Sequence, residues 1–197
     1  WALQLWHADL GVPLRYTAVD DAKFYLMLVK GLVAHGSYLS NANLGAPFGQ
    51  DLYDLPQGAD NLNLLLLRGL TLFSSSPAVV VNLFYLLTFA LVSVSCHWVL
   101  RALGVSAAVS GVVSVLYSLL TYHFFRGESH LFLSAYYAVP LAGYLFIRLL
   151  QGGELFARRA PPVLKRVPWI SKRSLATVGL CLVVGSDNLY YAVFALL

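Results

Sequence analysis

Two adjacent carboxylates, Asp20 and Asp21, are the residues of this chain whose type and spacing most directly permit chemistry. A carboxylate pair at the mouth of a helix bundle can act as a general base, accept a proton or bind a cation. The pair also stands where a helical pattern begins, and Asp is a favoured N-cap that interacts well with the positive end of the helix dipole. Capping explains one carboxylate well and two less well, so we expect a functional role for at least one of them.

Arg126, Glu128 and His130 form a second polar group, in a short segment between apolar stretches. The Arg guanidinium can bind a phosphate through two parallel hydrogen bonds, and His130 can donate a proton or a hydrogen bond to the same phosphate. A short solvated turn whose charges avoid lipid would also need polar residues here. Both interpretations stay open on the sequence alone.

Asp187 lies well inside the last apolar stretch, beside Gly185, Ser186 and Asn188. A carboxylate at that depth costs at least about 3 kcal/mol unless it faces a polar cavity or a partner, so it is a candidate functional residue. A hydrogen bond between helices that holds the bundle together is the structural alternative. A re-entrant break at Gly185, which would lift Asp187 toward the outer surface, is a further alternative.

Asp51 and Asp54 flank Tyr53 in a loop, where they could line a sugar-binding or cation-binding site, although turn formation explains Asp there equally well. Cys96 and Cys181 lie in apolar stretches without metal-ligand spacing, so we interpret them as small buried hydrophobic residues. The sequence contains no phosphate-binding Gly-rich loop, nucleophile elbow or zinc motif. The chemistry that we expect therefore centres on the carboxylates.

The hydropathy predicts the elements that position these residues. Apolar residues make up 59% of the chain and charged residues 11%, against about 45–50% and about 25% in an ordinary soluble domain. Four apolar stretches reach the length of about 20 residues that a helix needs to cross the hydrocarbon core, and a helix satisfies its own backbone groups in lipid. We therefore predict an all-α polytopic transmembrane helix bundle with spans at about 76–100, 106–125, 130–150 and 175–197.

The segment before the first span should hold two short helices. A helical pattern covers about 21–35, with apolar residues on one side and lysines on the other, and its length suits a helix lying in the membrane interface. Residues 37–60 are rich in Gly, Pro and Asn and are loop-like. The apolar stretch 61–74 is too short to span, which predicts an interfacial or re-entrant helix. We therefore divide the chain into a first loop, 1–60, and a membrane domain, 61–197.

The distribution of charge predicts the orientation in the membrane. Eight of the 13 basic residues lie in or beside two connections between spans, six of them in the linker 151–174, and seven of the nine acidic residues lie in the other connections. Basic loops stay on the cytoplasmic side, so we expect a cytoplasmic linker and an extracytoplasmic first loop, in a bacterial plasma membrane. Because that loop must be carried across the membrane, we expect at least one helix before Trp1, and we expect more after Leu197.

The stretch VDDAKFY, residues 19–25, combines an acidic pair on the first outer loop with the start of an interfacial helix, and a bundle of spans with short loops follows. This layout resembles the GT-C superfamily of polytopic membrane glycosyltransferases, which take a sugar from a polyprenyl-phosphate carrier. The stretch YHFFRGESH, residues 122–130, looks like loops of large bacterial membrane proteins grouped near that superfamily. The resemblance covers roughly the first half of a typical family core, and it implies that Asp20 or Asp21 is the catalytic acid.

We therefore expect transfer of a sugar from a polyprenyl-phosphate donor to an extracytoplasmic glycan, lipid or protein. Asp20 or Asp21 would take the proton from the acceptor hydroxyl, and Arg126 with His130 would neutralise the departing lipid phosphate. The further candidate substrate-binding residues are Glu128, Asp51, Asp54 and Asp187. No cofactor is required because the lipid phosphate is a good leaving group, and a divalent cation is optional. Besides donor and acceptor, the expected partner is the lipid bilayer, and nucleic acid is not expected.

Two other functions compete with this hypothesis. In an ion-coupled transporter or a flippase for lipid-linked sugars, Asp187 would be the proton- or cation-coupling site and the outer carboxylates would form a vestibule. In a non-catalytic membrane subunit of an envelope-assembly complex, no single carboxylate would matter. An enzyme should suffer most from substitution at Asp20 or Asp21, and a coupled carrier should suffer most at Asp187.

Overall fold

The computed structural model is mostly helical. Its described residues are 3, 5–14, 21–43, 45–51, 53, 60–156, 171–188, 190, 191 and 193. Asp20, Asp54 and the central part of the basic linker, 157–170, lie outside them. The prediction of a mostly helical chain is confirmed.

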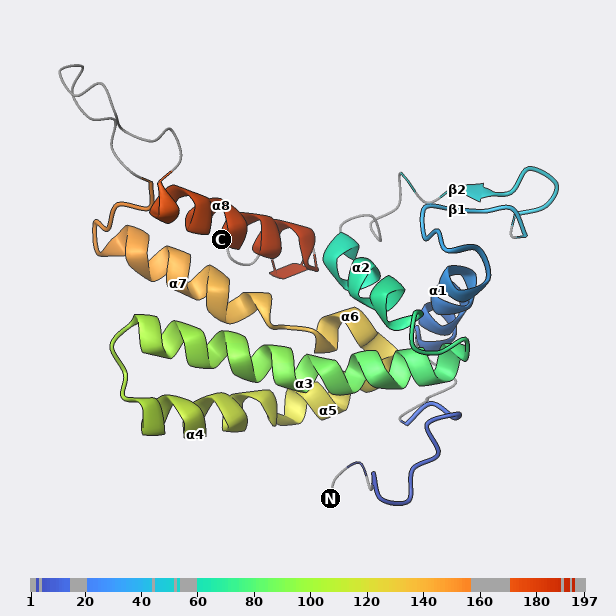
Figure 1. Cartoon of the computed structure of the whole chain (residues 1–197), viewed down its shortest axis with the longest axis horizontal. Coiled ribbons are helices and arrows are strands. Elements are labelled where there is room, and N and C mark those ends of the chain that lie inside the picture. Colours follow the sequence, from blue (N-terminus) through green and yellow to red (C-terminus); the bar gives the residue numbers. More distant parts are fainter. Residues whose placement is uncertain are drawn as a thin grey trace, which may run out of the picture.

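Four helices lie alongside one another in a row (Figure 1). Helix α3, Pro77–Ala102, packs against α4, Ala107–Ser118, on one side and against α7, Ala138–Leu150, on the other. Helix α8, Lys172–Ser186, packs on the far side of α7. Helices α3 and α7 run in one direction and α4 and α8 run in the other, so the α3–α4 and α7–α8 connections lie at the same end of the row (Figure 1).

Two short helices cover the other end of the row. Helix α1, Ala22–His35, and helix α2, Asn61–Leu70, both pack against α3 near its N-terminus (Figure 1). Helix α1 buries an apolar face that includes Leu28, Val29 and Leu32, and it ends at Gly36, whose φ of 73° is the left-handed conformation that favours glycine. Both helices occupy nearly the predicted ranges, about 21–35 and 61–74.

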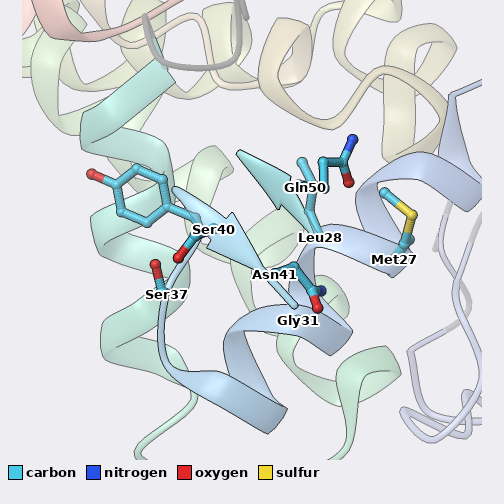
Figure 2. A pocket seen from close by; sticks show the side chains of 8 residues that line it. Met27, Leu28, Gly31, Ser37, Ser40, Asn41 and Gln50 are labelled. Carbon is cyan, nitrogen blue, oxygen red and sulfur yellow. The ribbon is translucent and has the colours of Figure 1, made fainter. Parts of the chain in front are cut away.

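A two-stranded antiparallel hairpin, which we did not predict, covers α1. Strand β1, Ser40–Asn41, pairs with β2, Gln50–Asp51. Figure 2 shows the small pocket between this hairpin and α1, in which Asn41 lies over Gly31. A Cβ at position 31 would lie 3.2 Å from the Asn41 side-chain nitrogen, so glycine permits the close approach.

Two helical stretches among the described residues have the length and apolarity to cross a membrane. They are Pro77–Ala102, with 26 residues, and Ala107–Ser134, with 28 residues. The second comprises α4, α5 (Thr121–Arg126), the 3-10 helix η2 (Gly127–His130) and α6 (Leu131–Ser134). Pro77 is the first residue of α3, a position where its missing N–H is not needed.

Three of the predicted spans differ from single continuous helices. The span expected at 106–125 is divided at Leu119 and Leu120. The span expected at 130–150 is interrupted at residues 135–137. Pro140 lies in the first turn of α7, where a backbone N–H has no acceptor within the helix, so the missing N–H of proline costs no hydrogen bond. The span expected at 175–197 stops as a helix at Ser186, because Asp187 adopts an extended backbone conformation.

Helix α4 buries its polar face and exposes its apolar face. Ser110, Ser114 and Ser118, at helical spacing, are at most 4% exposed, and each hydroxyl donates to a backbone carbonyl three residues earlier. Val112 and Leu116, by contrast, are each 62% exposed. Small side chains let α4 lie close to α3, while the branched side chains face outward.

Candidate functional site

Asp21 and His130 meet at the end of the row where α1 lies. The Asp21 Oδ2 atom is 3.5 Å from the His130 Nδ1 atom, and the two side chains are 63% and 28% exposed. Asp21 precedes α1 and His130 ends η2, and α1 packs against η2. The structure thus brings together one residue from each of the two polar groups that the sequence singled out, which we call the outer pair.

Segment 125–130 is not a short solvated turn. Arg126 ends α5 and η2 follows directly, with Glu128 only 2% exposed. The Arg126 guanidinium lies over the rings of Tyr122 and Phe125, at 5.4 and 6.0 Å from their centroids. Its Nε atom is buried and has no hydrogen-bond partner among the described residues. The cation is therefore held by aromatic rings, and part of its hydrogen-bonding capacity is unused.

Asp187 is completely buried at the C-terminal end of α8. Asn63, in the first turn of α2, donates a hydrogen bond of 2.8 Å from Nδ2 to Asp187 Oδ1. Tyr137, just before α7, donates a hydrogen bond of 2.8 Å to Asn63 Oδ1. The structural alternative, a hydrogen bond between helices, is therefore present, and it joins three elements that are remote in sequence.

Asp60 is the second acid of this buried group. Its side chain is 8% exposed, and the amide groups of Asn63 and Asn188 lie within hydrogen-bonding reach of its carboxyl group. Burial raises the pKa of Asp60 from its ordinary value of 3.8 to about 6, and the two amides oppose part of this rise. We call Asp60, Asn63, Tyr137, Asp187 and Asn188 the buried acid cluster.

The backbone at the end of α8 fixes the position of Asn188. Its Oδ1 accepts a hydrogen bond of 3.0 Å from the Tyr190 N–H, a local turn that starts the helical residues 190 and 191. Asn188 itself is 6% exposed. The break after Ser186 therefore places two polar side chains, Asp187 and Asn188, inside the molecule.

Tyr25 lies near one acid of the outer pair and one acid of the buried acid cluster. Burial raises the pKa of Tyr25 above its usual value, and the neighbouring carboxylates of Asp21 and Asp60 raise it further. The Tyr25 ring packs edge-on against Phe132, with 4.9 Å between the ring centroids. One neutral phenol is therefore within electrostatic range of an acid from each group.

Two carboxylate oxygens of the buried acid cluster have no hydrogen-bond partner among the described residues. They are Asp60 Oδ1 and Asp187 Oδ2, and both are buried. Buried polar atoms in folded proteins are usually paired, so two such oxygens in one cluster point to a missing partner.

The remaining predicted site residues lie elsewhere. Asp51 is exposed on strand β2 and belongs to neither group. Asp20 and Asp54 are outside the described residues, so the predicted Asp20–Asp21 and Asp51–Asp54 pairs cannot be compared with the structure as pairs. Of the predicted residues, the structure joins only Asp21 with His130 directly.

Sequence reasoning missed Asp60, Asn63 and Tyr137. The signal that it overlooked is in α2, whose buried face consists of Asn63, Leu64 and Leu67 and begins after Asp60. A polar residue at a core position of an apolar helix needs a partner, and that need would have pointed to Asp187.

Comparisons with protein-family models, with curated proteins and with solved structures found no match to this chain. The chemistry of the two groups is therefore argued from their geometry.

Proposed function

We propose that the chain belongs to a polytopic membrane protein that transfers a sugar from a polyprenyl-phosphate donor to an extracytoplasmic acceptor. The contact of 3.5 Å between Asp21 and His130 carries this proposal, because it unites an acid and a base that are 109 positions apart in the numbering. Both groups are partly exposed, as reacting side chains must be.

The inverted burial of α4 supports the membrane location. A helix that buries serines and exposes valines and leucines would be unfavourable in water. In lipid the same arrangement is favourable, because apolar side chains meet acyl chains and small polar side chains pack between helices. The two stretches that are long enough to cross a membrane include this helix.

The location of the basic residues supports the orientation. Arg101, Arg148, Lys172 and Arg173 lie at or beside the α3–α4 and α7–α8 connections, and the linker 151–174 between α7 and α8 has six basic residues in its sequence. Lys23 and Lys30 lie on α1, Arg68 on α2 and Arg126 on α5, so the excess of basic residues at the connections comes from the linker. Helices α1 and α2 and the hairpin lie at the opposite end of the row (Figure 1). We infer that the end with the connections is cytoplasmic, so that the outer pair faces the other compartment.

In the proposed reaction, Asp21 accepts the proton of the acceptor hydroxyl as its oxygen attacks the anomeric carbon. The bond from that carbon to the phosphate oxygen breaks, and the lipid phosphate leaves with the bonding electron pair. Arg126 offsets the negative charge of the departing phosphate, and His130 donates a hydrogen bond to it. The amphipathic helix α1 would lie in the interface, where the lipid carrier is also found.

The decisive experiment measures sugar transfer from synthetic polyprenyl-phosphate hexoses by the protein reconstituted in vesicles. A variant with Asn at both positions 20 and 21 should lose transfer while its expression and folding stay normal. Asp9→Asn changes an exposed carboxylate outside both groups, so it is the matched control and should keep transfer. Normal turnover by the double variant would exclude this mechanism.

An ion-coupled carrier is the second candidate, and the burial of Asp187 favours it. A carboxylate that is 0% exposed and tied to Asn63 resembles the intramembrane acids that couple transport to ions. Uptake or flipping assays in the same vesicles separate the two functions. If the protein is a carrier, Asp187→Asn should abolish coupled transport. If the protein is an enzyme, it should transfer sugar without any transport, and this transfer should depend on Asp21.

A further inference from the structure

We propose that Asp60 and Asp187 bind one divalent cation, Mg²⁺ or Ca²⁺, through the carboxylate oxygens that have no hydrogen-bond partner. This site is independent of the proposed glycosyl transfer, because it uses neither the outer pair nor a sugar donor. Its residues come from the turn before α2 and from the end of α8.

The geometry supplies two oxygens within one buried group. Asp60 is 8% exposed and Asp187 is 0% exposed, and Asp60 Oδ1 and Asp187 Oδ2 are unpaired among the described residues. Asn63 hydrogen bonds Asp187 at 2.8 Å and also lies within reach of Asp60. Asn63 therefore contacts both acids, and one carboxylate oxygen of each acid has no hydrogen-bond partner among the described residues.

The charge of the cluster requires compensation. The ion pairs observed among the described residues join His130 to Asp21 and Arg173 to Glu154, and neither involves Asp60 or Asp187. Leaving two carboxylates buried without a counter-charge costs several kcal/mol for each ion. One divalent cation neutralises both carboxylates, which a single monovalent cation would not do.

The donor atoms determine which cation fits. The cluster offers carboxylate, amide and phenol oxygens and contains no Cys or His, which favours the hard cations Mg²⁺ and Ca²⁺ over Zn²⁺. Among the described residues, no group of three or more His, Cys, Asp and Glu side chains is placed to hold a metal ion. Two carboxylates with further oxygen ligands from water or substrate are a normal Mg²⁺ arrangement.

Asn63, Asn188 and Tyr137 would act as positioning residues. Metal-binding carboxylates are usually held by hydrogen bonds to their second oxygen, and loss of such a partner weakens metal binding about 10–100-fold. Asn63 holds Asp187 in this way, Tyr137 holds Asn63, and Asn188 lies against Asp60.

The test uses the purified full chain, stripped of metal with a chelator. Tb³⁺ replaces Ca²⁺ and luminesces when excited through a nearby tyrosine, and Tyr25 and Tyr137 lie beside the two acids. We expect saturable luminescence that Ca²⁺ displaces. Asp60→Asn and Asp187→Asn should each weaken Tb³⁺ binding at least about ten-fold. Asp9→Asn, which changes an exposed carboxylate outside the cluster, should bind as the natural chain does.

Thermal unfolding gives a second measurement, and its first part, on the natural chain with and without the cation, does not depend on a variant folding well. Ca²⁺ or Mg²⁺ should raise the unfolding temperature of the natural chain and should leave that of Asp187→Asn unchanged. In chelator, Asp187→Asn should be at least as stable as the natural chain, because it removes a buried charge. Absence of both saturable luminescence and cation-dependent stabilisation in the natural chain would overturn the proposal, as would unchanged binding by Asp187→Asn.

Discussion

The side-chain amide of Asn63 donates a hydrogen bond of 2.8 Å to the carboxylate of Asp187, across 124 positions of sequence. Both side chains are 0% exposed, so this bond connects the first turn of α2 with the end of α8 inside the molecule. Asp187 is therefore buried within the protein at the end of α8, and α2 supplies its partner.

Substitution of Asn63 by Leu should strongly destabilise the fold. The change removes the donor to Asp187 and the acceptor for Tyr137, and it leaves a buried carboxylate with fewer partners. We expect a loss of about 3 kcal/mol in the free energy of unfolding. Asn61→Leu is the matched control, since Asn61 is only partly buried and accepts one hydrogen bond from Tyr38; it should lose about 1 kcal/mol. Denaturant unfolding in detergent measures both, and equal losses would contradict the assigned role of Asn63.

Stability should fall with rising pH in metal-free protein because of Asp60. Its pKa is about 6 in the folded chain against 3.8 ordinarily, so between these values the folded chain keeps a proton that the unfolded chain has released. The stabilising contribution of Asp60 to the free energy of unfolding is therefore complete below pH 3.8 and is lost as pH rises through about 6. The free energy of unfolding should drop by about 3 kcal/mol over this window.

Asp60→Asn isolates this effect from the other titrating groups. The variant has no proton to lose at position 60, so its unfolding free energy should depend less on pH between about 4 and 6. Chemical unfolding in chelator at several pH values measures the difference between the two proteins. Parallel pH profiles would mean that Asp60 has an ordinary pKa.

Much of the helical framework could be predicted from the sequence. Gly36 follows the last residue of α1 and Pro77 is the first residue of α3, and both residue types act there through local backbone geometry. The charge distribution predicted that Asp21 and His130 lie on one face of the membrane, but it did not predict the contact of 3.5 Å that the structure shows between them. Local backbone rules therefore predict where helices begin and end, and the contact is known only from the fold.

The breaks inside the apolar stretches could not be predicted in the same way. Hydropathy averages over about 20 residues and does not register a few polar side chains that bond across the bundle. Helix α8 stops at Ser186 because Asp187 and Asn188 turn inward to partners on α2, and those partners are known only from the fold. The hairpin over α1 was missed because its strands have two residues each and show no alternating pattern.

Enlarging a buried serine of α4 should disturb its packing on α3. Ser114 is 2% exposed, so Ser114→Leu forces three additional carbons into the interface and should cost about 1–3 kcal/mol. Val112→Leu adds one carbon on the face that is 62% exposed, and it should change stability by less than about 0.5 kcal/mol. Thermal unfolding in detergent compares the two variants. A larger loss for Val112→Leu would show that α4 faces the bundle with its apolar side.

Labelling with a membrane-impermeant maleimide should place the two ends of the row on opposite sides of the membrane. Phe48 is 96% exposed in the hairpin region, and Gln151 is exposed where α7 ends. In a background with Cys96 and Cys181 replaced by Ala, Phe48→Cys should be labelled in intact cells, because we assign the hairpin to the extracytoplasmic side. Gln151→Cys should be labelled only after permeabilisation, because it adjoins the basic linker, which should remain in the cytoplasm. Labelling of Phe48→Cys only after permeabilisation would place the outer pair in the cytoplasm, away from the compartment that holds the acceptor, and glycosyl transfer at Asp21 would then be excluded.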